Sequence, residues 1–214
     1  MKHEADITII LDRSGSMDSI ATDVVGGFNH FVTEQRAQPG DCRLTLVQFD
    51  DHYDVVYAEQ PIADAPLLTA GTFQPRGTTA LLDAVGRTIE ATGDRLRMLP
   101  ETDRPDRVLM VIITDGLENA STRYTRARVF EMISTQRDVY RWGFLFMAAN
   151  QDAIQEGGHI GIAPKAAMNF DSDGASYRLA SAAMSAAVSE FRETGEAEFS
   201  QPTTGARVKK KRVH

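Results

Sequence analysis

Three side chains that carry oxygen stand on alternate residues of one short segment, Asp12-Arg-Ser14-Gly-Ser16, which directly follows an apolar run. Oxygen ligands suit a hard cation, and Mg²⁺ takes about six of them while usually keeping some of its waters. Hydroxyl groups with one or two carboxylates are therefore a suitable donor set. Asp and Ser are also preferred at the start of helices, and the segment taken alone is better explained as a helix cap.

Two further segments carry side-chain oxygens at comparable places along the chain. Gly77-Thr-Thr79 precedes a run with helical spacing, and Thr114-Asp115-Gly116 leaves the most strand-like run of the sequence. Asp12 also stands at the end of a strand-like run. Ligands of parallel α/β sheets bind beyond the carboxyl ends of the strands, so the three segments are expected to meet at that edge. Their combination favours a metal site over unrelated helix caps.

Strand-like and helix-like patterns alternate along the chain. Nearly continuous apolar runs rich in β-branched residues predict strands buried on both faces of a parallel sheet, at residues 6–11, 107–114, 142–149 and 167–170. Apolar residues three and four apart predict helices at residues 20–32, 81–89, 129–133 and 175–192. The runs 43–49 and 54–57, joined by Asp50-Asp51-His52, predict an antiparallel hairpin whose second run is an edge strand.

The alternation of strands and helices predicts a three-layer, doubly wound α/β fold with a mostly parallel central sheet and one antiparallel edge strand. A length of 214 residues suits one large domain. We expect this domain to span residues 1–199. Residues 200–214 are basic and are expected to form a solvated, disordered tail.

The three segments together resemble the metal-ion-dependent adhesion site (MIDAS) of von Willebrand factor type A domains, with Asp-x-Ser-x-Ser, Gly-x-Thr before a helix and a later Thr-Asp-Gly. The resemblance covers residues 6–192 and is strongest with bacterial stand-alone domains that carry Asp-Arg-Ser-Gly-Ser-Met and Thr-Asp-Gly-Leu-Glu-Asn. It implies the Rossmann-like fold of that family. It also implies a metal site in which Ser14, Ser16 and Thr79 ligate the cation, while Asp12 and Asp115 bind it directly or through water.

The same resemblance implies a function in protein recognition. A cation held mainly by neutral hydroxyls keeps excess positive charge and an open position, which an Asp or Glu of a partner protein fills. Mg²⁺ is expected from its cellular abundance and the oxygen ligands, although Mn²⁺ and Ca²⁺ also suit them. In some relatives the last helix, here residues 175–192, shifts when the open position is filled.

Composition argues against several other classes. The net charge of −7 and the pI near 5.2 argue against general attraction to nucleic acid, with the basic residues at 207–212 as a local exception. No apolar run reaches the roughly 18 residues that a membrane helix needs. The single cysteine, Cys42, cannot form an internal disulfide, and the N-terminus lacks a secretory pattern, so we expect a cytoplasmic setting.

Two alternatives to a docking domain stay open. A cation beside serines also suits a metal-dependent hydrolase or an enzyme that handles phosphoryl groups, but the sequence lacks a nucleophile elbow, a Walker loop and His-Glu-x-x-His, and we expect no enzyme. In the second alternative, the metal only stabilises a structural domain. Four polar residues near the motifs are candidates for the border of a docking surface, namely Asp18, Asp23, Glu118 and Asn119.

Overall fold

The structure of the protein is a computed structural model, which describes residues 4–149 and 152–199. In these ranges the strands form one sheet in the order β3-β2-β1-β4-β5-β6. They are β1 (Ala5–Asp12), β2 (Cys42–Phe49), β3 (Tyr53–Pro61), β4 (Arg107–Thr114), β5 (Gly143–Ala149) and β6 (Ala167–Phe170). Among these described strands, only β2 and β3 pair in the antiparallel direction. The predicted mostly parallel sheet with one antiparallel edge strand is therefore confirmed.

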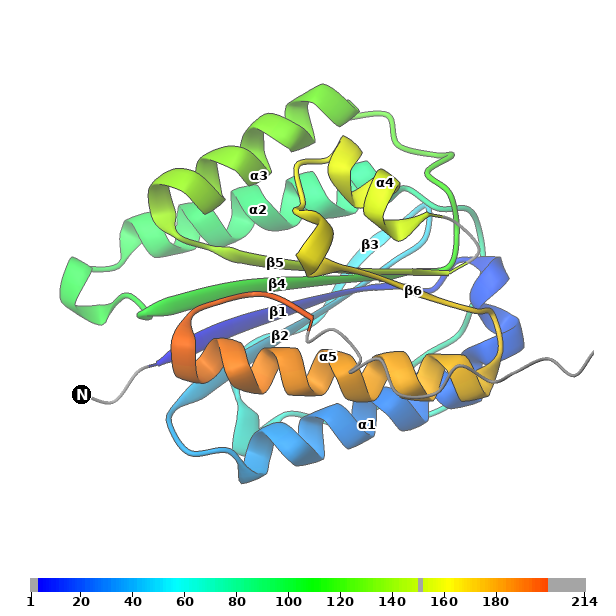
Figure 1. Cartoon of the computed structure of the whole chain (residues 1–214), viewed down its shortest axis with the longest axis horizontal. Coiled ribbons are helices and arrows are strands. Elements are labelled where there is room, and N and C mark those ends of the chain that lie inside the picture. The colour runs from blue at the N-terminus through cyan, green and yellow to red at the C-terminus, as the bar shows by residue number, and fades with distance from the viewer. Residues whose placement is uncertain (1–3, 150–151, 200–214) are drawn as a thin grey trace, which may run out of the picture.

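Helices cover both faces of this sheet (Figure 1). They are α1 (Ala21–Ala37), α2 (Leu81–Met98), α3 (Arg126–Tyr140), α4 (Ala153–His159) and α5 (Gly174–Thr194), and short 3-10 helices occur at η1 (Gly15–Ile20), η2 (Ile62–Asp64), η3 (Glu101–Asp103) and η4 (Pro164–Ala166). α1 and α5 lie on one face, and α2, α3 and α4 on the other. Within the described part of the chain, no helix is long and apolar enough to cross a membrane.

The core lies on both sides of the central strands. β1 and β5 are buried along their whole length, because helices cover both of their faces. Burial of these aliphatic and aromatic side chains is the main favourable contribution to folding. β3 stands at the edge and is largely exposed, which explains why its apolar pattern is short and weak in the sequence.

α1 and α5 are also joined by a buried polar contact. The guanidinium of Arg192 donates hydrogen bonds to the backbone carbonyl and side-chain oxygens of Gln35, at 2.8 and 3.1 Å, and to the carbonyls of Pro39 and Gly40, at 3.2 and 3.0 Å. The Gln35 side chain in turn donates to the Ser185 carbonyl of α5 at 3.1 Å. The bond to Gln35 satisfies a carbonyl in the last turn of α1, which a helix leaves without a partner of its own, and the bonds to Pro39 and Gly40 fix the segment that follows the helix.

Some elements differ from the sequence predictions. The third predicted helix, at residues 129–133, extends over the whole of α3, because Thr125 caps its start by accepting a hydrogen bond from the N–H of Arg128. α4 was not predicted, since Gly157 and Gly158 lower its helix propensity. The predicted tail at 200–214 lies outside the described residues.

Candidate metal centre

Two neighbouring strands bring the first motif beside the last. β1 and β4 pair in parallel, with Leu11 opposite Ile113, so both strands end at the same edge of the sheet. Asp12 is the last residue of β1, and its Oδ2 accepts a hydrogen bond of 2.6 Å from the hydroxyl of Thr114 at the end of β4. Its Oδ1 accepts one of 2.6 Å from the N–H of Ser14. The sheet register thus places Asp12 beside the loop that follows β4.

Three hydroxyl groups gather around one point next to Gly116. The Oγ atoms of Ser14 and Ser16 lie 3.1 Å apart, and Ser16 donates a hydrogen bond of 2.5 Å to Oδ1 of Asp115. A Cβ atom added to Gly116 would lie 2.7 Å from Oγ1 of Thr79, 3.5 Å from Oγ of Ser16 and 3.6 Å from Oγ of Ser14. A glycine at this position therefore leaves open a space that the hydroxyls border.

Backbone hydrogen bonds hold the first two motifs against each other. The N–H of Gly15 donates to the carbonyl of Gly77 at 3.3 Å, and the N–H of Arg76 donates to the carbonyl of Arg13 at 2.8 Å. Gly77 has a φ of 68°, a left-handed conformation that favours glycine. The segment before α2 therefore lies directly on the loop after β1, and Thr79 reaches the serines.

The two acidic residues of this site are buried without a cationic partner. The exposed fractions are 0% for Asp12 and 5% for Asp115. Burial raises the pKa of Asp12 to about 6, and burial also raises the pKa of Asp115. Within the described ranges, neither carboxylate forms an ion pair with Lys, Arg or His. Buried carboxylates are unfavourable unless positive charge compensates them, so a divalent cation fits this donor set.

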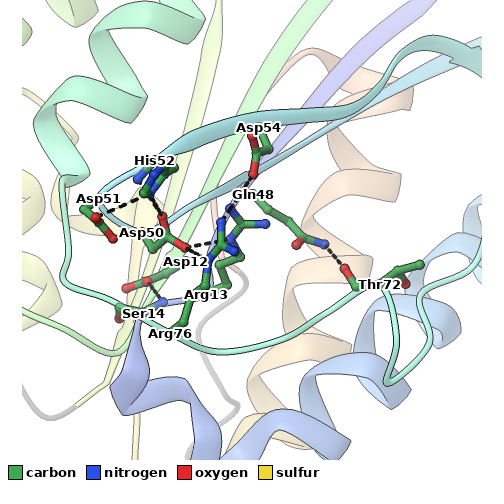
Figure 2. Close-up of polar contacts among 10 residues, drawn as sticks. All are labelled: Asp12, Arg13, Ser14, Gln48, Asp50, Asp51, His52, Asp54, Thr72 and Arg76. Atoms are coloured by element: carbon green, nitrogen blue, oxygen red, sulfur yellow. Dashed lines mark hydrogen bonds and ion pairs between the residues drawn. The ribbon is translucent and has the colours of Figure 1, made fainter.

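A second acidic group lies in the turn between β2 and β3 (Figure 2). Possible ligand atoms of Asp50, Asp51 and His52 all lie within 4.8 Å of one another. The Asp50 carboxylate, however, already accepts hydrogen bonds from Nε of Arg13 at 3.0 Å, Nε of Arg76 at 2.8 Å and the N–H of His52 at 2.5 Å. Burial alone would raise the pKa of Asp50, but the bonds from Arg76 and His52 and the charge of Arg13 lower it. These arginines neutralise Asp50 without a metal.

Asp50 instead connects the loops that carry the candidate ligands, a role that the sequence alone does not predict. Its carboxylate binds Arg13 from the loop after β1 and Arg76 from the segment before α2, as Figure 2 shows. Its backbone carbonyl accepts a hydrogen bond of 3.0 Å from the N–H of Ala80. In the sequence, Asp50 is one of several polar residues in a predicted turn, and the arginines inside and beside the motifs were the available signal for an acidic partner.

Comparison with known proteins identifies the fold. No protein-family model and no curated protein matches the sequence. Among solved structures, the von Willebrand factor type A protein from Catenulispora acidiphila matches with a TM-score of 0.54 and 16% identity, over 87% of this chain and 42% of that one. Proximal thread matrix protein 1 from the mussel byssus, with a zinc-occupied MIDAS motif, matches with a TM-score of 0.51 and 15% identity, over 84% of this chain and 46% of that one. The manganese-loaded TRAP protein of Plasmodium vivax matches with a TM-score of 0.51 and 15% identity, over 83% of this chain and 72% of that one.

This chain has the von Willebrand factor type A fold. The fold that the motifs predicted by resemblance is thus confirmed. The chain spans less than half the length of the Catenulispora and mussel proteins. In this von Willebrand A fold the hydroxyl cluster lies at the carboxyl edge of the sheet, where ligands of open α/β sheets bind.

The four candidates for the border of a docking surface have different surroundings in the von Willebrand A fold. Asp23 forms an ion pair with Arg178 of α5. Glu118 is half-buried, and its Oε2 accepts a hydrogen bond of 2.9 Å from the N–H of Leu82 at the start of α2. Asp18 and Asn119 are exposed near the candidate ligands. Exposure therefore suits Asp18 and Asn119 better than the other two for contact with a partner.

Proposed function

We propose that this von Willebrand A domain binds a protein partner through a divalent cation. The hydroxyls of Ser14, Ser16 and Thr79 would ligate the cation, while Asp12 and Asp115 would bind it directly or through water. The observation that carries the proposal is the gathering of the three hydroxyls around one point, beside two buried carboxylates that form no ion pair in the described part of the chain.

The chemistry of the donor set explains why a partner would bind there. Mg²⁺ prefers oxygen ligands and keeps part of its water shell, so a site with few carboxylates leaves positions that another ligand can take. A carboxylate from an Asp or Glu of the partner would supply that ligand. On the protein side, Asp12 orients the backbone of Ser14, and Asp115 orients the hydroxyl of Ser16. Metal and partner would therefore bind together.

Magnesium is the cation that we propose. The TRAP protein is manganese-loaded and the mussel protein carries zinc in its MIDAS motif, which supports a divalent cation in general. Zinc sites more often use nitrogen and sulfur ligands, whereas Mg²⁺ and Mn²⁺ prefer oxygens. The hydroxyl and carboxylate oxygens of this site favour Mg²⁺ and Mn²⁺ over zinc, and cellular abundance favours Mg²⁺.

A binding function is proposed rather than an enzymatic one. The hydroxyls of Ser14 and Ser16 contact each other, and the hydroxyl of Ser16 donates to Asp115. A nucleophilic serine needs an adjacent base that is itself held in place by a third group. In residues 4–149 and 152–199, no histidine is hydrogen-bonded to either serine, which supports binding over hydrolysis. The acidic net charge supports a protein partner over nucleic acid, and a cytoplasmic location is part of the proposal.

Calorimetric titration with Mg²⁺ and Mn²⁺ tests the metal site. The metal-stripped wild type is compared with Thr79→Ala and with Thr78→Ala, an exposed neighbour of the same residue type. Loss of a residue that only supports a ligand already weakens metal binding about 10-fold to 100-fold, so loss of Thr79 should cost at least about tenfold. Thr78→Ala should bind like the wild type. Equal affinities in all three proteins would remove Thr79 from the site.

A capture experiment separates docking from a purely structural metal. The immobilised wild type and Thr79→Ala are exposed to cell lysate with Mg²⁺ or with a chelator. A partner that binds only the wild type, and only with Mg²⁺, supports the docking function. Capture that is unchanged by chelator and by the substitution indicates a scaffold whose metal stabilises the fold. Turnover of a substrate would instead support the enzymatic alternative.

A further inference from the structure

Thr79 differs from the other candidate ligands in how it is held. Ser16 is hydrogen-bonded to Asp115, and Asp12 binds the backbone of Ser14. These four residues therefore fix one another by direct contacts across the loops after β1 and β4. In the described part of the chain, the hydrogen bonds of Thr79 involve its backbone, so the place of its hydroxyl depends on how that backbone is anchored.

Asn119 provides that anchor through two hydrogen bonds. Its side-chain Oδ1 accepts a hydrogen bond of 2.9 Å from the N–H of Thr79, and its backbone N–H donates one of 3.1 Å to the carbonyl of Thr79. Asn119 belongs to the same loop as Asp115, which it follows by four residues. The backbone of one candidate ligand is thus tied to the loop that carries another, although the two come from different elements.

Two carboxylates fix the loop that contains Asn119 to α2, one from the loop and one from the helix. Glu118 accepts hydrogen bonds from the N–H groups of Leu82 at 2.9 Å and of Ser121 at 2.8 Å. In the opposite direction, Asp83 of α2 accepts the N–H groups of Thr122 at 3.0 Å and Tyr124 at 2.8 Å. A negative charge in the first turn of a helix is favourable. Asn119 is therefore held on a loop with little freedom to move relative to α2.

We propose that Asn119 is a positioning residue for the candidate metal centre. By pairing with both backbone groups of Thr79, it sets where the Thr79 hydroxyl lies relative to Asp115 before a cation arrives. The inference rests on the proposed function, since it concerns the same site. A side chain that holds a ligand in place lowers the cost of ordering that ligand on binding, and its loss weakens binding without removing a donor.

The test compares Asn119→Ala with two matched variants of the metal-stripped full chain. Asn119→Asp keeps a side-chain oxygen that can accept the N–H of Thr79. Thr122→Ala removes an exposed side chain from the same loop and leaves the backbone bond of Thr122 to Asp83 intact. Two quantities are measured: the affinity for Mn²⁺ by calorimetry, and the hydrogen exchange of the Thr79 amide without metal by nuclear magnetic resonance.

We expect Asn119→Ala to bind Mn²⁺ about tenfold more weakly and to exchange its Thr79 amide faster than the wild type. Asn119→Asp should restore slow exchange and binding, and Thr122→Ala should match the wild type in both. If the wild type binds Mn²⁺ and Asn119→Ala binds it equally tightly, the positioning role is overturned and the proposed metal site is not. If the wild type binds neither Mn²⁺ nor Mg²⁺, the proposed function is overturned together with this role. The exchange data still report in that case whether Asn119 holds Thr79.

Discussion

The hydroxyl of Ser16 donates a hydrogen bond of 2.5 Å to the carboxylate of Asp115, which lies 99 residues further along the chain. This bond joins the loop after β1 to the loop after β4 at the edge of the sheet. It also holds two candidate ligands close together. Ligands that are already in place lose less conformational freedom on binding, so the arrangement favours a tight site.

Gly116→Ala should abolish or strongly weaken metal binding. The added Cβ would lie 2.7 Å from Oγ1 of Thr79 and would enter the space that the hydroxyls border. Calorimetry with Mg²⁺ should show a loss of at least about tenfold, in line with other changes around metal ligands. Gly93→Ala is the control, because a Cβ there meets no atom within 4 Å. Undiminished binding by Gly116→Ala would mean that the cation lies elsewhere.

Mg²⁺ should raise the melting temperature of the metal-stripped protein. A ligand that binds only the native state at about 100 times its Kd adds about 2.7 kcal/mol to the free energy of unfolding. For a domain of this size, that corresponds to an increase of roughly 5 to 10 °C. Thermal unfolding with increasing Mg²⁺ measures the shift. Thr79→Ala should show a much smaller shift, and an equal shift would point to a cation bound at another site.

Arg192→Met should destabilise the fold without weakening the metal site. Arg192 is buried and donates to the backbone carbonyl and side-chain oxygens of buried Gln35, and each buried acceptor left without a donor costs about 1–3 kcal/mol. We expect a loss of about 3 kcal/mol in urea unfolding. Arg178→Met, on the same helix, is the control, since Arg178 is exposed and an exposed ion pair contributes at most about 1 kcal/mol. Equal losses in the two variants would contradict this role.

Asp6 should make stability fall as the pH rises in the acidic range. Asp6 is buried in β1 and is paired with Arg95 of α2 through one carboxylate oxygen, while the other has no hydrogen-bond partner in the described structure. Burial raises the pKa of Asp6 despite the opposing effect of Arg95. The native state therefore keeps this proton at pH values where the unfolded chain, with a pKa of about 3.9, has released it. Stability from this group decreases from about pH 4 up to the raised pKa.

Urea unfolding of the wild type and Asp6→Asn between pH 4 and pH 7 measures this effect. The difference in unfolding free energy between the two proteins should shift in favour of Asp6→Asn as the pH rises through that window. Asp64→Asn, a substitution at an exposed position, is the control for general changes in net charge. Parallel pH profiles for the wild type and Asp6→Asn would show that Asp6 titrates alike in the folded and unfolded chains.

Local sequence predicted the central strands and the places of the acidic residues. β1 and β4 are apolar along nearly their whole length because helices cover both of their faces. Such a continuous apolar run is a local feature of the sequence and can be recognised within a few residues. Asp12 and Asp115 follow these runs, and parallel strands end at a common edge, so their proximity was also predictable. The three motifs, taken together, then predicted the fold family.

Helix lengths and α4 were harder to predict because they depend on contacts outside the helix. The start of α4 is fixed by Asp152, which accepts the N–H groups of Ile154 and Gln155, and by Asn169 of β6, which accepts the N–H of Ala153 at 2.7 Å. The last of these contacts comes from another element, the strand β6. It supports a short helix that contains two adjacent glycines and has little propensity of its own.

The roles of Asp50 and Asn119 were decided only by the tertiary structure. Asp50 stands in the predicted turn of the hairpin and Asn119 in the loop after β4. Their partners are distant in sequence: Arg13 and Asp50 are 37 residues apart, and Thr79 and Asn119 are 40 apart. Buried polar groups must find partners, but a sequence does not state which donor meets which acceptor. The sequence by itself therefore determined the fold and the chemical types of the candidate ligands. The tertiary structure decided how the loops that carry them are held together, because that depends on which loops the sheet brings to one edge.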